Sequence, residues 1–322
     1  MEMALIEPFM VKSQFALGTD TAIELEAKTG ESLVVKDVII RASTDEYVLL
    51  EIDKTTVGFF RVDNHVFKSH LPDTVALVSG SGDERGYLAG GSVTLLSYMI
   101  RKGWMRGYPV AEGQTFRVKP YTSGKKLNHV MIIYEKYDAG DIKATDPNGS
   151  ESKEYVFVNY GRVENSITTA GDYEVSNCVT TEEFPDFPFG KTVPSKTTID
   201  ILAVLGSDCI NYVDDSNYVY TKYLKMFRGR TCLFDMDKNG IPFYGIKFTG
   251  ISAGTTYGKG YSYIGNYTNK DRREPFVPPT PLTFSEGDDL KIYISAGAVG
   301  SSASIDVKYG EIALVEKVTI AE

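Results

Sequence analysis

Three oxygen-bearing side chains at alternate positions form the best candidate for a ligand site in the 322-residue sequence. Asp235, Asp237 and Asn239 match positions one, three and five of a calcium-binding loop, and Gly240 matches position six. The twelfth position, where such a loop carries a bidentate glutamate, is Ile246. A hairpin turn in which Asn239 and Gly240 supply positive φ angles explains the same residues, and it is the stronger of the two interpretations.

Other patterns for catalysis or metal binding are incomplete. His65 and His70 lie five residues apart, which is not the helical spacing of a zinc-binding pair. The sequence contains no Cys-x-x-Cys and no Gly-x-Ser-x-Gly nucleophile elbow. The three cysteines are expected to be free thiols, with a bridge between the last two left open: Cys178, Cys209 and Cys232. We therefore expect no enzymatic activity and no cofactor.

Aromatic residues point instead to binding surfaces. Trp104 stands in a short basic and aromatic segment, and four tyrosines crowd a second segment: Tyr257, Tyr261, Tyr263 and Tyr267. Tryptophan, tyrosine and arginine are enriched at protein interfaces, and exposed tyrosines can stack on sugars. Tyrosine is also common in β-strands, which explains the same residues without a ligand.

Composition excludes several classes of protein. The sequence has 34 basic and 43 acidic residues, a formal net charge of −9, which argues against general nucleic-acid binding. No run of about 18 apolar residues is present, so no transmembrane helix is expected. A content of 42% hydrophobic and 12% aromatic residues excludes a mainly disordered chain. Residues 1–14 lack the basic start of a secretory signal and are expected to form an N-terminal arm.

The elements that must position these residues are predicted to be strands. Apolar and polar residues alternate with period two in four segments: Thr21–Ala27, Thr115–Lys119, Leu290–Ile294 and Ile305–Tyr309. Further strands are expected at Leu33–Ala42, Val48–Ile52, Thr56–Val62, Ser92–Met99, Val130–Tyr137, Thr197–Leu205, Val219–Phe227, Thr231–Asp235, Phe243–Ile251 and Ile312–Ile320. Only two short helices are expected, near Leu71–Leu77 and Asp208–Tyr212. The predicted fold class is all-β, built of antiparallel sandwiches.

A weak internal repeat suggests two domains. Glu112-Gly113 precedes the strand of Phe116 and Val118, and Glu286-Gly287 precedes the strand of Leu290 and Ile292, with the glycines 174 residues apart. In the second strand of each hairpin, Val130, Ile132 and Tyr134 align with Ile305, Val307 and Tyr309. The repeat predicts one jelly-roll domain at 15–140 and another at 191–322, joined by a connector at 141–190. In the connector, Phe184, Phe187 and Phe189 are expected to fill an apolar groove.

Two tandem β domains with these repeated hairpins resemble the double jelly-roll major capsid proteins of icosahedral viruses, the lineage of adenovirus hexon and the archaeal turreted viruses. The resemblance implies two eight-stranded sandwiches and a homotrimer that forms a pseudo-hexagonal tile. It also implies self-assembly, contact with other capsid or minor virion proteins, and a place in the virion after assembly in the host cytoplasm. The chain departs from the family in its connector of 50 residues, which contains the strand-like segment Tyr155–Tyr160.

Two other functions remain open from the sequence. A receptor- or glycan-binding spike or adhesin would use the exposed tyrosines and contact host-cell glycans. A β-sandwich hydrolase would need convergent carboxylates in a cleft, and it is the weakest of the three interpretations.

Overall fold

The computed structural model describes residues 5–42, 46–62, 94–142, 153–164, 170–179, 184–207, 212–214, 217–218, 221–234, 241–242, 244–247, 260–263, 266–269, 272–296 and 311–321. These residues form an all-β protein in which one short helix accompanies several antiparallel sheets. The chain forms two compact units, and the main boundary between them falls within a strand, after Val158. We refer to β1–β8 with α1 as the first unit and to β9–β23 as the second.

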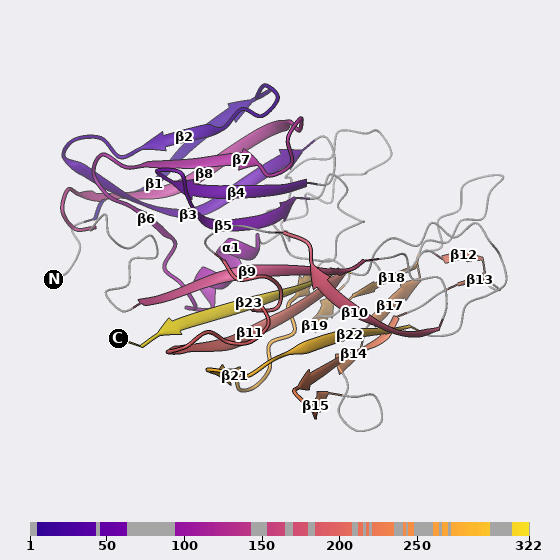
Figure 1. The fold of residues 1–322 in the computed structure, drawn as a ribbon. Coiled ribbons are helices and arrows are strands. Elements are labelled where there is room, and N and C mark those ends of the chain that lie inside the picture. The colour runs from indigo at the N-terminus through magenta and orange to yellow at the C-terminus, as the bar shows by residue number, and fades with distance from the viewer. Residues whose placement is uncertain are drawn as a thin grey trace. The chain divides into compact units, whose positions relative to one another are not determined.

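The first unit consists of two four-stranded sheets (Figure 1). Its strands are β1 (Leu5–Phe15), β2 (Ile23–Glu26), β3 (Glu31–Ala42), β4 (Glu46–Ile52), β5 (Thr55–Val62), β6 (Tyr108–Val110), β7 (Thr115–Pro120) and β8 (Leu127–Asp138). The sheet orders are β1-β8-β3-β6 and β2-β7-β4-β5, and every pairing is antiparallel. The pairing is nested: the first strand pairs with the eighth, the second with the seventh, the third with the sixth and the fourth with the fifth.

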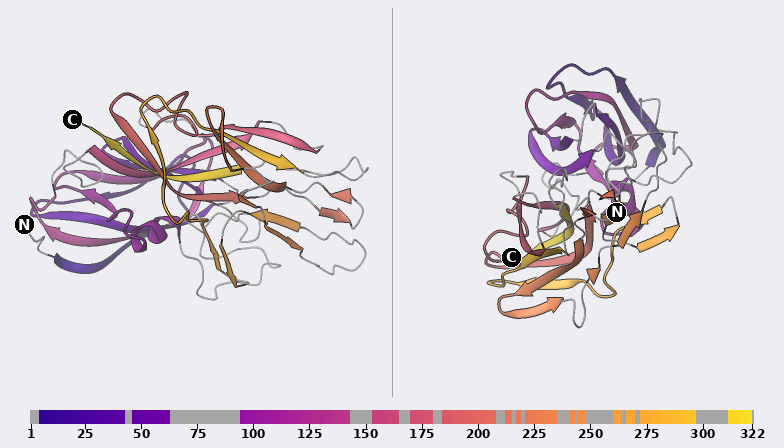
Figure 2. Two further views of the ribbon diagram at one scale, coloured as in Figure 1. Left: turned by 90° about the horizontal axis from the view of Figure 1, so that it is seen from below. Right: turned by 90° about the vertical axis from the view of Figure 1, so that its right-hand side faces the viewer.

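Alternating apolar residues form the core of the first unit, as period-two sequences require. Phe116 and Val118 of β7 are buried, while the residues between them are partly exposed. The ring of Tyr108 on one sheet stacks 6.1 Å from Phe116 on the other. Gly58 of β5 makes room for this ring, because a Cβ there would lie 2.3 Å from the Tyr108 hydroxyl. The two sheets therefore share one core, and their strands curve around it in Figure 2.

The strand predicted at Ser92–Met99 is wrong, because this segment contains the helix α1 (Leu95–Arg101). Thr94 caps the helix: its hydroxyl oxygen accepts a hydrogen bond from the Ser97 N–H at 3.0 Å and donates one to Asp37 Oδ1 at 2.5 Å. Burial raises the pKa of the Asp37 carboxyl, and the bond from Thr94 opposes that shift. The capping hydroxyl and the helical spacing of buried apolar residues after it decide the structure here.

The described residues of the second unit form a nine-stranded sheet and three short two-stranded sheets. The large sheet holds β9 (Lys153–Val163), β10 (Gly171–Asn177), β11 (Thr197–Ser207), β14 (Thr221–Arg228), β15 (Thr231–Phe234), β16 (Ile241–Pro242), β21 (Leu282–Ser285), β22 (Lys291–Ala296) and β23 (Glu311–Ile320). The short sheets pair β12 (Tyr212–Asp214) with β13 (Asn217–Tyr218), β17 (Tyr244–Lys247) with β18 (Gly260–Tyr263), and β19 (Asn266–Asn269) with β20 (Arg272–Glu274). Figure 1 shows β23, in yellow, between β9 and β11.

The nine-stranded sheet repeats the strand orders of the first unit. Its order is β15-β14-β22-β10-β9-β23-β11-β21, with β16 beside β14. One half, β9-β23-β11-β21, corresponds to β1-β8-β3-β6, and the other, β10-β22-β14-β15, corresponds to β2-β7-β4-β5. The halves join at β10, which pairs with β22 through residues 171–174 and with β9 through residues 175–177.

The repeated Glu-Gly turns occupy equivalent corners of the two units. Gly113 donates its N–H to the Ala27 carbonyl at 2.8 Å, and Gly287 donates to the Val193 carbonyl at 3.0 Å. Their φ angles, 81° and 82°, lie in the left-handed region that favours glycine. The preceding glutamates also correspond. Glu112 accepts from the Gly30 N–H at 3.0 Å, and Glu286 accepts from the Lys196 N–H at 2.8 Å.

The structure also locates the segments outside the predicted domains. Strand β1 occupies most of the region expected to be an N-terminal arm, and β9 and β10 lie within the expected connector at 141–190. Between β10 and β11, Phe187 and Phe189 are buried and Phe184 is half-buried. The ring of Phe189 lies 5.2 Å from that of Phe284 on β21, so this segment packs into the second unit. Leu71–Leu77, residues 208–211 and Ile305–Tyr309 lie outside the described residues.

Candidate assembly interface

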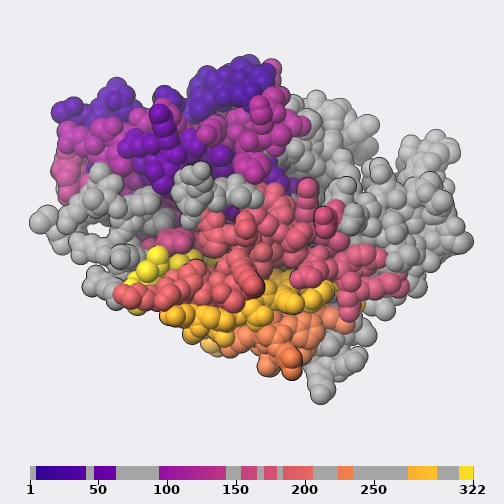
Figure 3. Space-filling view, in the orientation of Figure 1, coloured from indigo at the N-terminus to yellow at the C-terminus, as the bar shows by residue number. Residues whose placement is uncertain are grey.

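Strand β1 carries most of the exposed apolar surface of the described residues. Five of the six large hydrophobic side chains that are exposed there belong to it: Leu5, Ile6, Phe9, Val11 and Phe15. Phe9 is 65% exposed and Phe15 is 71% exposed. The sixth, Tyr121, follows β7. In Figure 3 the indigo side chains of the N-terminal strands are open to view. A cluster of this kind marks an interaction surface.

The position of β1 in its sheet leaves one side without a neighbour. It is the terminal strand of β1-β8-β3-β6 and pairs only with β8 in the described structure. At its end the Phe15 ring stacks on His129 with centroids 3.9 Å apart, and Ser13 Oγ lies 2.8 Å from His129 Nε2. These contacts hold the strand in its register with β8. An edge strand of 11 residues with apolar side chains is a template for pairing with another strand.

The charged groups around the start of β1 are ordered by β3 and β8. Glu7 lies opposite Lys136 of β8, and Lys136 Nζ forms an ion pair with Glu31 Oε2 of β3 at 2.5 Å. The hydrogen bond from Lys136 lowers the pKa of the Glu31 carboxyl, and the same bond raises the pKa of the Lys136 ammonium. Both side chains therefore carry their charges at neutral pH.

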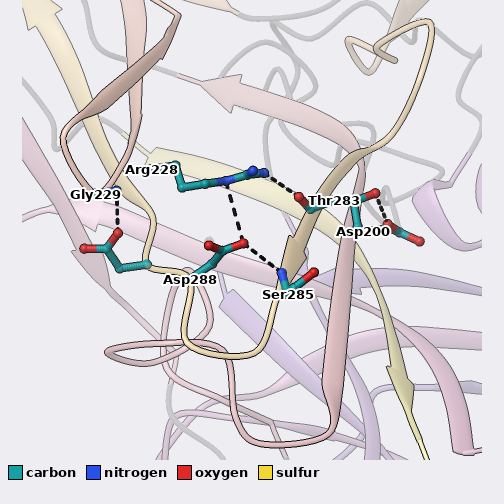
Figure 4. A network of polar contacts seen from close by, with 7 residues as sticks. Asp200, Arg228, Gly229, Thr283, Ser285 and Asp288 are labelled. Carbon is teal, nitrogen blue, oxygen red and sulfur yellow. Dashed lines mark hydrogen bonds and ion pairs between the residues drawn. The ribbon is translucent and has the colours of Figure 1, made fainter.

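A polar network around Arg228 lies at the end of β14 in the second unit (Figure 4). The Arg228 guanidinium donates to the Thr283 carbonyl, lies 4.5 Å from the Phe284 ring centroid, and has its Nε 3.8 Å from Asp288 Oδ2. Asp288 Oδ2 accepts from the Ser285 N–H at 2.9 Å.

Two other carboxylates complete this network. Asp200 Oδ1 accepts from Thr283 Oγ1 at 2.6 Å, and Asp289 Oδ1 accepts from the Gly229 N–H at 2.5 Å. Each carboxylate is thus bound by a backbone or hydroxyl donor. The network joins β14, β11 and the turn before β22, and its contacts hold these segments together.

The predicted calcium ligands Asp235, Asp237 and Asn239 lie outside the described residues. Among the residues that the structure describes, no group of three or more histidine, cysteine, aspartate or glutamate side chains is arranged to hold a metal ion. Cys178 and Cys232 form no disulfide in the described structure, and Cys209 is not among the described residues.

The predicted aromatic interface residues fall in separate elements. Trp104 follows α1, is half-buried, and meets Tyr98 edge-on at a centroid distance of 5.8 Å. Tyr261 and Tyr263 lie in β18, opposite Ile246 and Tyr244 of β17. Tyr267 lies in β19, opposite Arg273 of β20, and Tyr257 is outside the described residues. Trp104 therefore packs as part of the first unit, with its ring against α1.

Sequence patterns did not predict the exposed apolar surface of β1. The signal was the alternation of Phe9, Val11 and Phe15, which is typical of a strand rather than of an arm. The exposure of β1 depends on which strands lie beside it, and no local sequence pattern predicts that pairing.

In the part of the chain that is described, no helix has the length and apolar character needed to cross a membrane. Neither the protein-family models nor the curated proteins give a match to this sequence.

Proposed function

We propose that the chain is a structural protein that assembles with copies of itself into a viral capsid, as a double jelly-roll major capsid protein. The observation that carries the proposal is the repeated strand order. A jelly roll pairs its eight strands in nested order. The proposal is supported by that order in the two four-stranded sheets of the first unit and in the two halves of the nine-stranded sheet of the second. The matched corners at Gly113 and Gly287 support an origin of the two units by duplication.

The physical properties of a duplicated sandwich suit this role. Its strands pair within the chain at most positions, so each unit is a rigid block. Three copies of a two-block chain place six similar blocks around a threefold axis, which allows hexagonal tiling by a single gene product. The exposed side of β1 offers an apolar surface for contact between copies or with other capsid or minor virion proteins. On this proposal the chain has no reaction to catalyse and acts in the virion.

The test is the mass and shape of the purified protein in solution. Light scattering should give about 107 kDa, three times the chain mass of 35.6 kDa, and negative-stain images of the same peak should show six-lobed particles. A protein that stays monomeric at high concentration and forms no lattice would contradict the proposal. Elongated particles that bind glycans saturably would instead favour a receptor- or glycan-binding spike or adhesin.

A further inference from the structure

We propose that β1 of one copy pairs antiparallel with β1 of a second copy, about a twofold axis that passes beside Met10. The inference rests on the proposed function, because a twofold contact of this kind would join neighbouring trimers of the assembled shell. Its occupant is a second copy of this chain, and the argument comes from the backbone, the charges and the side chains of β1.

Among the described strands, none pairs with β1 on the side away from β8. Ala16 donates its N–H to the Asn128 carbonyl at 2.7 Å, and the register from Met10 to Phe15 is regular. In an antiparallel ladder, residues that bond to the partner alternate with residues that face away. Val11, Ser13 and Phe15 therefore present their N–H and C=O groups to the free edge. A strand added there would extend the sheet.

A bulge in β1 sets the register. Glu7 pairs with Lys136 of β8, and Met10 pairs with Tyr134. Met10 is three positions after Glu7 in the sequence, but Tyr134 is only two positions before Lys136. The extra residue lies at Pro8–Phe9, and Pro8, which has no N–H, suits a bulge on an edge strand. As a result, Glu7 lies two ladder positions before Met10.

This register makes the strand complementary in charge to a second copy of itself. Lys12 lies two ladder positions after Met10, as Glu7 lies two positions before it. A twofold axis beside Met10 therefore places Glu7 of each copy directly opposite Lys12 of the other. Both residues belong to the series that bonds to β8, so they would face each other as non-hydrogen-bonded pairs, in which side chains are closest. Two ion pairs form per contact, with no like charges opposed.

The apolar side chains fit the same register. The axis brings Phe9, in the bulge of one copy, beside Val11 of the other copy. An aromatic residue across from a β-branched residue is a favourable cross-strand pair. Both side chains are exposed in the single chain, so the pairing removes apolar surface from water.

A cysteine placed at the axis tests the register in the full chain. Met10→Cys is introduced with Cys178, Cys209 and Cys232 changed to serine, and the protein is oxidised at assembly concentration. The two Cα atoms at the axis would be about 4.5 Å apart, within reach of a disulfide. Gln14→Cys is the matched control, since its two copies would lie about 26 Å apart, eight residues along the strand direction. We expect a covalent dimer for Met10→Cys and none for Gln14→Cys.

Charge exchange gives a second test that needs no covalent bond. Glu7→Lys or Lys12→Glu alone places like charges opposite each other twice per contact, and each should weaken association about tenfold or more. The double variant restores opposite charges and should return the dissociation constant to within about threefold of the original.

Absence of the Met10→Cys dimer, or failure of the double variant to recover, overturns the strand pairing. If the unmodified protein still forms trimers or lattices in either case, the proposed function stands and only this contact is wrong. If the unmodified protein does not associate at all, both proposals fail.

Discussion

Strands β1 and β9 hold the same place in the nested pairing of their units, but their surroundings differ. Strand β9 lies between β10 and β23, and its residues 156–161 are buried. Among the strands that the structure describes, β1 has only β8 as a neighbour, and none of its residues is fully buried. The same strand position thus closes the core of one unit and presents a free apolar edge in the other.

The connection into the third strand shows a second difference. In the first unit four residues join β2 to β3, whereas 19 residues join β10 to β11. The longer connection carries Phe187 and Phe189 into the second unit, and then rejoins the common corner at Val193. Asn159 Nδ2 holds this segment by donating to the Pro188 carbonyl at 2.9 Å.

The two units share the corners and the nested strand order, and they differ in the first strand and in the loops. The corners keep the same hydrogen bonds because they set the path between sheets, and the nested pairing depends on that path. The first strand and the loops can change without altering the strand order. In this chain those variable parts provide the added core of the second unit and the free edge of the first.

The largest loss of stability is expected where a side chain is added to a glycine that packs closely against a buried ring. Each unit contains such a glycine. A Cβ on Gly161 would lie 2.4 Å from the Phe187 ring, and a Cβ on Gly58 would lie 2.3 Å from the Tyr108 hydroxyl. Gly161→Ala and Gly58→Ala should each lower the free energy of unfolding by about 3 kcal/mol, because the buried rings must move. Urea unfolding followed by tyrosine fluorescence would measure both losses.

The two clashes should differ in how they can be relieved. Tyr108→Phe removes the atom closest to the Gly58 Cβ position, at 2.3 Å, and leaves the ring carbon Cζ at 3.0 Å, so the double variant should recover at least about half of the loss. The Tyr108 hydroxyl is buried with no hydrogen-bond partner, and burial raises the pKa of the phenol, so its removal costs little. No such atom exists at Gly161, where the ring itself is in the way. Equal recovery in both units would contradict this difference.

A buried carboxyl without hydrogen bonds gives the second unit a response to pH. Glu316 of β23 is fully buried, and neither of its oxygens has a hydrogen-bond partner. Burial raises its pKa well above the usual value of 4.5. The folded state therefore holds a proton that the unfolded chain releases, so its contribution to stability is present below pH 4.5 and is lost as the pH rises through the folded pKa.

Glu316→Met should remove this loss and raise the free energy of unfolding by about 2 kcal/mol at neutral pH, with little change at pH 4. Thermal unfolding over pH 4 to 8 would measure the difference in slope. Glu154→Met on the neighbouring strand is the control: its carboxylate is partly exposed and pairs with Lys317 at 2.9 Å, so its effect should stay below about 0.5 kcal/mol. An unchanged slope for Glu316→Met would refute the prediction.

The sequence was sufficient for features that depend on local patterns. The all-β class, most strands and the corners at Gly113 and Gly287 followed from alternation and from glycine before a strand. The helix at Leu95–Arg101 was missed because its apolar residues also fit a strand, and the decisive contact, Thr94 to Asp37, joins residues 57 positions apart.

Features that depend on strand order had no local signal. The exposure of β1 requires that only β8 lies beside it, and the burial of Phe187 requires Gly161 on a distant strand. The polar network of Arg228 joins three segments that are far apart in the sequence. The candidate interface therefore emerged from the pairing and not from residue types.

A smaller effect is expected from the two corner glutamates. Glu112→Ala removes the acceptor of the Gly30 N–H, and Glu286→Ala removes the acceptor of the Lys196 N–H. Each should lower the free energy of unfolding by about 1 kcal/mol, because the bonds are exposed and water replaces part of each. Chemical denaturation of both variants would show whether the corners are equivalent. If the two losses in free energy of unfolding differ by more than about threefold, the two corners are not equivalent.

The smallest effect on stability is expected at the two residues whose N–H groups donate to the corner glutamates. Gly30 has a φ angle of +86°, and its counterpart Lys196 has +58°, a conformation that costs a side chain about 1 kcal/mol. Lys196→Gly relieves that cost but adds freedom to the unfolded chain, so a net gain of about 0.5 kcal/mol is expected. Gly30→Lys should change stability by a similar amount in the opposite direction, since a Cβ there meets no atom within 4 Å. Calorimetric melting of both variants would measure the shifts, and shifts of the same sign would mean that the two corners are held by different forces.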